Sequence, residues 1–268
     1  MTVAKKKISP RGEDKQKKKR WRGALLALLL IAAVIAAVLF AVFGAAKLLF
    51  TANPRFQLRE TRVSGPGYWK DHPEELARRI KLEKGVNLFA LDLRAVRKQI
   101  REIPNVDNCS VMRVLPDTLV INIVERVPRA ILGRARSPWL VDGNAVVIPR
   151  SQFGKQLGHL PVIKDVKLTG AQAGKTFKKV KQAVDLVMTT VHSFPDFQIH
   201  SISLRDPEKM LIYLRYRNFP IYQVTLPVKN RGLSFSLIAL QSAIINARER
   251  GETRIHYDLS YDNKVVIN

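Results

Sequence analysis

The acid–base pair Glu125-Arg126 is the first place in this sequence to look for chemistry, because it closes the stretch VLPDTLVINIVERVP at residues 114–128. A carboxylate beside a guanidinium could serve as a general base with its charge partner. In an extended strand, however, adjacent side chains point to opposite faces of the sheet. The two groups are therefore unsuited to act on one substrate atom, and we expect them to fix a domain junction through separate salt bridges.

The other residues that could do chemistry are few and poorly spaced. Cys109 is the only cysteine and falls in a predicted strand, where a small buried apolar residue is favoured over a nucleophile. No nucleophile elbow, phosphate-binding loop or dinucleotide fingerprint occurs, and no histidine spacing sets two metal ligands on one helix face. The sequence thus predicts no catalytic residue, no metal site and no cofactor, and the protein is not expected to be an enzyme. The histidines are His72, His159, His192, His200 and His256.

The charge and the apolar residues are concentrated at the start of the chain. The formal net charge is +24, and residues 1–22 hold ten basic and two acidic residues with almost nothing apolar, so we expect this tail to be disordered. Residues 23–46 follow without a charge or a proline. As a helix they would be about 36 Å long, enough to cross a hydrocarbon core of about 30 Å.

An uncleaved membrane anchor is the reading that this apolar run favours. A cleaved signal peptide usually has a shorter apolar region of about 7–15 residues, and a buried helix of a soluble protein is rarely uncharged over such a length. Trp21 lies where an interfacial aromatic belongs, and the basic tail should stay in the cytoplasm by the positive-inside rule. We therefore expect a single-pass protein of the plasma (inner) membrane, with everything after about Phe50 extracytoplasmic (periplasmic).

The expected cytoplasmic location of the basic tail also indicates which partners its positive charge can contact. A basic tail beside the membrane attracts anionic lipid at roughly 1 kcal/mol per basic residue near the surface, so membrane lipid is an expected partner. Nucleic acid is not expected, because the densest basic cluster is topogenic and aromatic residues are not interleaved with lysine and arginine as stacking platforms.

Residues 56–130 read as a compact α+β domain in the order β-α-α-β-β. A strand at 57–63 is followed by a helix with Asp71 as its expected N-cap. A second helix follows Asp92, and two strands are then joined through Pro116-Asp117. Two helices can cover one face of such a sheet. The second helix has one apolar stripe, formed by Leu93, Val96, Ile100 and Ile103.

Residues 131–268 read as a β-rich domain with two helices packed on one face. WLVDGNAVVIP at 139–149 is typical of a hairpin, and the helices are expected at 175–193 and 233–250. Strands are expected at 197–204, 210–217 and 221–228 and in the last stretches of the chain. The expected apolar face of the first helix consists of Phe177, Val180, Val184, Val187 and Val191.

These features together resemble the FtsQ/DivIB family of bacterial cell-division proteins, and the first exported domain resembles the POTRA domain of that family. The resemblance rests on the basic tail, the single anchor, VSG at 63–65, GVNLFALDL at 85–93 and the hairpin that ends in Glu-Arg-x-Pro. WLVDGNAVVI, LPVI at 160–163 and YDLSY at 257–261 resemble parts of its β domain. The sequence departs from the family pattern at Asn105, where an aromatic often stands, and at Ser260, where a basic residue is usual.

The resemblance implies assembly rather than catalysis. It implies a bitopic scaffold at the division septum that links proteins during septum formation, with FtsB-like and FtsL-like small bitopic proteins and other membrane proteins of the divisome as partners. It also places a partner site at the C-terminal sheet edge, where unpaired backbone groups could accept an added strand. The candidate partner-binding residues are Tyr261, Asp262, Asn263, Lys264, Val265, Val266 and Ile267.

Two alternatives remain open on the sequence alone. A POTRA domain also occurs in chaperone or transport-assembly modules of the cell envelope, although these usually end in a membrane β-barrel, for which the rest of this chain is short. The C-terminal edge, in turn, could be paired or blunted instead of free.

Overall fold

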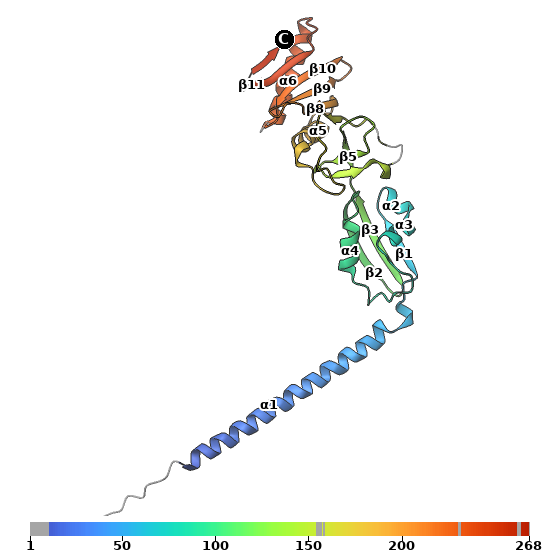
Figure 1. Cartoon of the computed structure of the whole chain (residues 1–268), viewed down its shortest axis with the longest axis vertical. Helices are drawn as coiled ribbons and strands as arrows, with labels where there is room; N and C mark the ends of the chain where they lie inside the picture. Colours follow the sequence, from blue (N-terminus) through green and yellow to red (C-terminus); the bar gives the residue numbers. More distant parts are fainter. Residues whose placement is uncertain (1–10, 154–156, 158, 230–231, 262–263, 268) are drawn as a thin grey trace, which may run out of the picture. The chain divides into compact units, whose positions relative to one another are not determined.

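The computed structural model describes residues 11–153, 157, 159–229, 232–261 and 264–267 (Figure 1). Helix α1, Arg11–Ala46, begins well before the expected apolar segment and continues into a π-helical turn at Lys47–Thr51. The expectation of a disordered tail is therefore wrong from Arg11 onward, since lysine, arginine and glutamine are good helix formers next to a long apolar helix. The part of the helix long and apolar enough to cross a membrane is Leu25–Thr51, extending beyond the expected end at residue 46.

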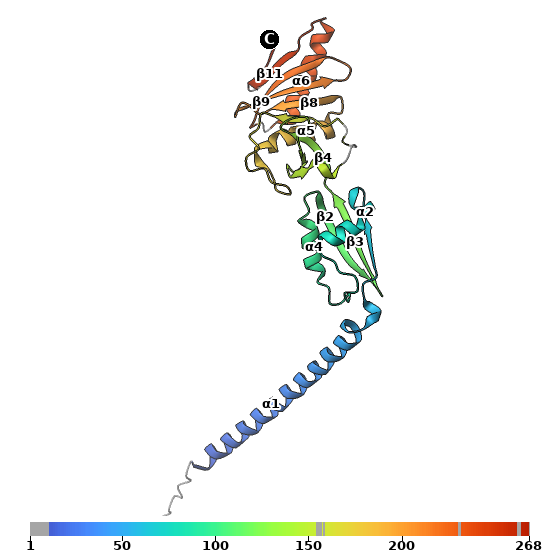
Figure 2. The same ribbon diagram turned by 45° about the vertical axis from the view of Figure 1, so that its right-hand side comes forward.

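The first sheet has three strands in the order β1-β3-β2. Buried and accessible residues alternate along β3, with Leu119, Ile121 and Ile123 buried, so one face of this sheet meets the core. Helix α4 runs alongside β2 in both views (Figures 1 and 2). The elements are β1 Glu60–Ser64, α2 Tyr68–Asp71, α3 Pro73–Arg79, α4 Leu93–Arg101, β2 Val106–Val114 and β3 Thr118–Glu125.

Of the two helix starts predicted in this domain, one agrees with the structure and one does not. Asp92 caps α4 as its position suggests, because its Oδ1 accepts hydrogen bonds from Arg94 N at 2.8 Å and Ala95 N at 3.3 Å. Asp71, the expected N-cap of the first helix, does not cap it. Asp71 is the last residue of α2, and His72 is the N-cap of α3. Pro73 separates the two pieces, since the residue before a proline is disfavoured in helical geometry.

The second sheet has nine strands in the order β12-β11-β10-β9-β8-β7-β4-β5-β6. Neighbours β4 and β7, β7 and β8, and β10 and β11 are parallel, and the remaining pairs are antiparallel. Strand β4 already belongs to this sheet and begins at Pro128. The strands are β4 Pro128–Leu132, β5 Trp139–Asp142, β6 Val147–Pro149, β7 Val162–Lys164, β8 Phe197–Ser203, β9 Lys209–Tyr216, β10 Ile221–Pro227, β11 His256–Tyr261 and β12 Lys264–Ile267.

Helices α5, Lys181–Ser193, and α6, Leu233–Glu249, pack into one core with this sheet. Strand β9 shows why: Met210, Ile212, Leu214 and Tyr216 are all buried, whereas the residues between them are partly exposed. A mixed fold of helices and sheets, with a β-rich second domain that carries helices, is therefore confirmed. Of the expected apolar face of α5, only Val191 fails to pack, with 53% of its surface exposed.

Candidate functional site

The expected partner site lies where the second sheet ends. Tyr261 is the last residue of β11, and Lys264, Val265, Val266 and Ile267 make up β12, whereas Asp262 and Asn263 lie outside the described residues. In the sheet order of the described strands, β12 is terminal and has β11 as its neighbour. A terminal strand of four residues offers about 14 Å of backbone to an added strand.

The hydrogen-bond pattern indicates which backbone groups of β12 face the open side. Gln223 N donates to Ile255 O at 2.8 Å, so the odd-numbered residues of β11 direct their backbone groups toward β10. Asp258 then directs its groups toward β12, where it pairs with Val266. Because these directions alternate along a strand, Val265 and Ile267 turn their N–H and C=O groups away from β11.

Two tyrosines and an arginine form a packed base beneath this edge. Tyr257 of β11 is 2% exposed and meets Tyr222 of β10 edge to face, with ring centroids 5.8 Å apart. Arg248 of α6 donates to the Tyr222 hydroxyl from Nε at 3.3 Å and Nη2 at 3.2 Å, and its guanidinium lies 4.7 Å from the Phe219 ring centroid. Burial also raises the pKa of Tyr257. These contacts pack β11, the neighbour of the terminal strand, against β10 and α6.

Helix α6 presents apolar side chains on its outer surface as well as on its buried one. Phe235, Ile238 and Ile245 are 63%, 53% and 38% exposed, and with the exposed Ser242 they fall at helical spacing on one side. We call these four residues the α6 stripe. The sequence predicted a helix at 233–250 but not this exposed apolar side. The signal that reveals the stripe is the scarcity of charged residues all round the helix in LSFSLIALQSAII.

Glu125 and Arg126 do point to different partners, as the strand geometry predicts. Glu125 Oε1 accepts a hydrogen bond from the backbone N–H of Trp69 at 2.8 Å. Its carboxylate also lies 2.6–2.7 Å from the place that a Cβ at Gly67 would take. In place of the expected salt bridge, the Glu125 carboxylate therefore accepts a hydrogen bond from a backbone amide.

Arg126 makes the expected salt bridges, and it makes two of them. Its Nη1 lies 2.9 Å from Asp107 Oδ1 on β2 and 2.7 Å from Asp142 Oδ2 at the end of β5. The Asp142 side chain is 6% exposed, and its other oxygen accepts from Asn144 N and Val146 N in the β5–β6 turn. Arg126 thus connects a strand of the first sheet with a turn of the second.

Asn105 stands where an aromatic is usual in the resembled family, and it is fully buried. Its Oδ1 accepts a hydrogen bond from Trp69 Nε1 at 3.0 Å, and its backbone oxygen accepts from Arg126 N at 2.7 Å. Asn105 therefore binds the Trp69 indole through its side chain and the Arg126 N–H through its backbone oxygen, a role that charge and apolar periodicity could not predict.

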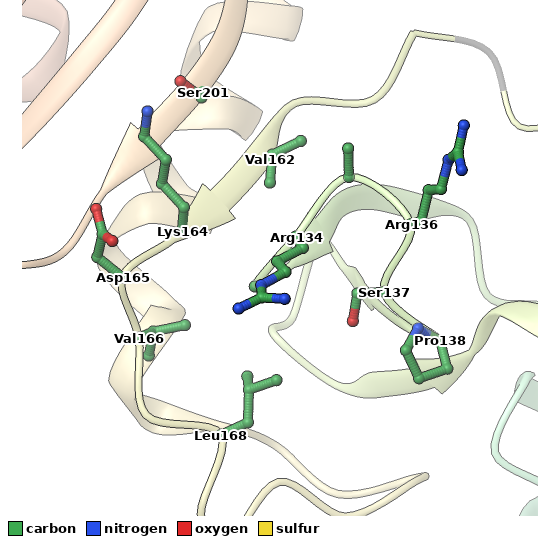
Figure 3. Close-up of a pocket in the computed structure, with 12 residues that line it drawn as sticks. Arg134, Arg136, Ser137, Pro138, Val162, Lys164, Asp165, Val166, Leu168 and Ser201 are labelled. Carbon is green, nitrogen blue, oxygen red and sulfur yellow. The ribbon is translucent and has the colours of Figure 1, made fainter.

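A hollow of about 980 Å³ opens beside β7, between the loop that joins β4 to β5 and the residues that follow β7 (Figure 3). Val162, Val166 and Leu168 are among the apolar residues that line it. In Figure 3 the Arg134 side chain points into the hollow and Arg136 points away from it. Ser203 Oγ donates to Asp165, and this bond holds the pKa of the carboxyl below its ordinary value. The lining thus combines basic and apolar side chains with the carboxylate of Asp165.

The described residues contain no group of three or more histidine, cysteine, aspartate or glutamate side chains that could hold a metal ion. His200 is the histidine in the most unusual setting. Burial lowers its pKa, with a smaller contribution from Arg215 and His159, and its Nε2 has no hydrogen-bond partner. Cys109 is buried, its Sγ lies 3.6 Å from Arg97 O, and burial raises the pKa of its thiol. A thiol in this state is a poor nucleophile.

Comparison with known proteins identifies the class of the first domain. A family model described as "POTRA domain, FtsQ-type" matches residues 56–126, which include α2, α3, α4 and all three strands of the first sheet. Residues 56–126 therefore match a POTRA domain of the FtsQ type, and among the described residues one apolar helix fits a single membrane span.

Similar proteins indicate to which family of POTRA-domain proteins the chain is related. A cell division protein FtsQ of Syntrophotalea carbinolica is 27% identical over 232 residues, which cover 81% of this chain and 79% of the relative. An FtsQ of Novosphingobium aromaticivorans is 33% identical over 98 residues, covering 37% of this chain and 29% of that protein. A cell division protein DivIB of Clostridium acetobutylicum is 24% identical over 155 residues, covering 57% of each chain. The family model and these relatives together support a protein of the FtsQ/DivIB family of cell-division proteins.

Proposed function

We propose that this cell-division protein is a bitopic scaffold that links partner proteins during septum formation. Its N-terminus would lie in the cytoplasm and its two domains outside the plasma membrane, at the division septum. FtsB-like and FtsL-like small bitopic proteins are the proposed partners, together with other membrane proteins of the divisome. The basic residues near the N-terminus would contact anionic lipid of the cytoplasmic leaflet.

The proposed mode of binding is the addition of a partner strand to β12. The observation that supports it is the terminal place of β12 in the sheet, with Val265 and Ile267 turning backbone groups to the open side. Main-chain hydrogen bonds then supply affinity, and side-chain contacts supply specificity. The α6 stripe belongs to the helix that contacts both β11 and β12, so a partner that continues past its strand could pack apolar side chains there.

Replacing Val265 by proline tests this mode of binding. Proline removes the N–H that faces the open edge and leaves the pairing of Val266 with β11 in place. We expect Val265→Pro to lose co-purification with the membrane partners of the full-length chain.

The matched control is Val265→Ala, which shortens the same side chain but keeps the N–H, and it should retain binding. Equal binding by both variants would contradict strand addition at β12. Equal loss in both would assign the affinity to the side chain and not to the backbone.

A further inference from the structure

The end of the membrane span is tied to the first domain by specific contacts. Phe50 lies in the last turn of the apolar segment, and its ring centroid is 6.1 Å from that of Phe56 and 5.2 Å from that of Phe89. Asn87 Nδ2 donates to Phe50 O at 2.9 Å and to Asn53 O at 3.1 Å. The loop at residues 84–91 is therefore bound to the residues with which the span ends.

The turn between β2 and β3 is bound to the same loop. Arg113 donates from Nε to Leu88 O at 2.6 Å and from Nη2 to Leu91 O at 2.7 Å, and its guanidinium lies 5.9 Å from the Phe89 ring centroid. Residues 113–118, which we call the hairpin tip, group with the span and with residues 84–91 as one compact unit.

The hairpin tip is apolar where a turn in water is usually polar. Val114 and Leu115 are 42% and 53% exposed, and Pro116 is exposed beside them. Leu48, Leu49 and Phe50, at the end of the span and in the same compact unit, are also exposed. Exposed apolar side chains grouped with the end of a membrane span are favoured in a nonpolar medium, and the bilayer in which the span ends supplies one.

Basic residues border this surface. Arg55, Arg59 and Lys84 are exposed in the same compact unit, and Lys47 lies in the last turn of the apolar helix. The acidic residues described in the extracytoplasmic part of this unit are Glu60 and Asp117. An apolar face with a basic border is the composition of segments that lie in the interface of an anionic bilayer.

We propose that the hairpin tip is a membrane-docking surface. Val114, Leu115 and Pro116 enter the interfacial layer of the leaflet in which the span ends, and Arg55, Arg59 and Lys84 lie over its anionic headgroups. The POTRA domain is then held on the bilayer by two attachments, the span and the tip, instead of being tethered by the span alone. This proposal rests on α1 crossing the membrane and is independent of strand addition at β12.

A spin label at residue 115 tests the docking in the full-length protein. Leu115→Cys is made in a Cys109→Ser background and labelled with a nitroxide, and the chain is placed in nanodiscs of phosphatidylcholine mixed equally with phosphatidylglycerol. The accessibility of the label to oxygen and to a water-soluble nickel chelate gives its depth. We expect a depth of about 5–10 Å below the headgroups, as for an interfacial apolar side chain.

Two controls make the result decisive. A label at Lys167→Cys, an exposed position beyond β7, should be accessible to the nickel chelate. Circular dichroism should show that both labelled variants are folded. If the label at residue 115 is as accessible to the nickel chelate as the label at residue 167, docking on lipid is overturned. A partner protein that covers the tip in cells would then be the alternative.

The basic border is tested by the lipid and by substitution. In discs of phosphatidylcholine alone, or with Arg55, Arg59 and Lys84 all changed to glutamine, the label at residue 115 should move toward water. An unchanged depth in both cases would overturn the electrostatic part of the proposal and leave an apolar contact only.

Discussion

At the scale of residues, the stretch that suggested an acid–base pair is a structural connection. Glu125 binds a backbone amide of α2, and Arg126 joins Asp107 to Asp142. The Arg126 side chain is 15% exposed and that of Asp142 is 6% exposed, so the shorter bridge is shielded from water and the bridge to Asp107 is not. The two bridges should therefore differ in their contribution to the free energy of unfolding.

Replacing Arg126 by methionine should lower the free energy of unfolding by about 3 kcal/mol, because it leaves the buried Asp142 carboxylate without its cation. Asp107→Asn, in contrast, removes a half-exposed partner and should cost less than about 1 kcal/mol. Denaturant unfolding of the full chain in detergent, followed by tryptophan fluorescence, measures both. Equal losses in the two variants would contradict the assignment of the stronger bridge to Asp142.

His200 should make stability depend on pH. Because its pKa in the folded protein lies below its ordinary value of about 6.5, the unfolded state takes up a proton first as the pH falls. Stability should thus decrease from about pH 7 downward until the pH reaches the folded-state pKa, and then level off. We expect His200→Gln to remove this slope from unfolding curves measured across the range.

The exposed His192 supplies the control for that measurement. His192→Gln should keep the pH slope of the unmodified protein. A slope that survives in His200→Gln would show that another group is responsible.

At the scale of elements, the apolar patterns predicted the positions of helices and strands well, and the errors have local physical causes. The stripe on α4 and the alternation on β9 follow the side-chain periods of helix and strand. The start of α3 was misplaced because Pro73 divides a continuous helical pattern. Val191 was expected in the core because spacing alone does not show where a helix leaves the sheet. The role of Asn105 depends on a partner 36 residues away in the chain, which no local pattern records.

Glycine substitutions should separate backbone conformation from close approach. Gly65 has a φ of +127°, and a Cβ there would lie 2.0 Å from Ile123 O on β3. Gly85 has a φ of +85° with nothing within 4 Å of a Cβ. Gly85→Ala should cost about 1 kcal/mol through the left-handed conformation alone. Gly65→Ala should cost clearly more, as thermal unfolding would show, because β3 must also move. Equal costs would contradict the close approach.

The two faces of α6 should respond differently to substitution. Leu240 is 1% exposed in the main core, so Leu240→Ala should lower the free energy of unfolding by about 2–5 kcal/mol. Ile238→Lys on the α6 stripe should change it by no more than about 0.5 kcal/mol and still weaken co-purification with partners. Unchanged partner binding by Ile238→Lys would remove the α6 stripe from the proposed interface.

At the scale of the whole molecule, no reaction centre is predicted, and the surfaces singled out above are suited to attachment. One apolar helix fits the membrane, the hairpin tip is proposed to rest on it, and the terminal strand of the second sheet is proposed to receive a partner. The family and the fold class were accessible from sequence because they rest on long apolar patterns and on the POTRA hairpin. The backbone groups of β12 that face the open side could not be predicted from the sequence, because they depend on the register of β10, β11 and β12.

The cellular prediction belongs to this scale. A fluorescent fusion of the full chain should form a band at midcell in dividing cells, and depletion of the protein should block septum formation. A uniform membrane signal together with normal division after depletion would contradict a scaffold role.

Amide hydrogen exchange with and without a membrane partner tests the central claim most directly. The N–H of Val266 should already be protected in the free protein, because it pairs with β11, whereas the N–H groups of Val265 and Ile267 should exchange quickly. Binding of a partner strand should slow exchange at Val265 and Ile267. Protection that appears elsewhere, with Val265 and Ile267 unchanged in a complex that demonstrably forms, would contradict strand addition at β12.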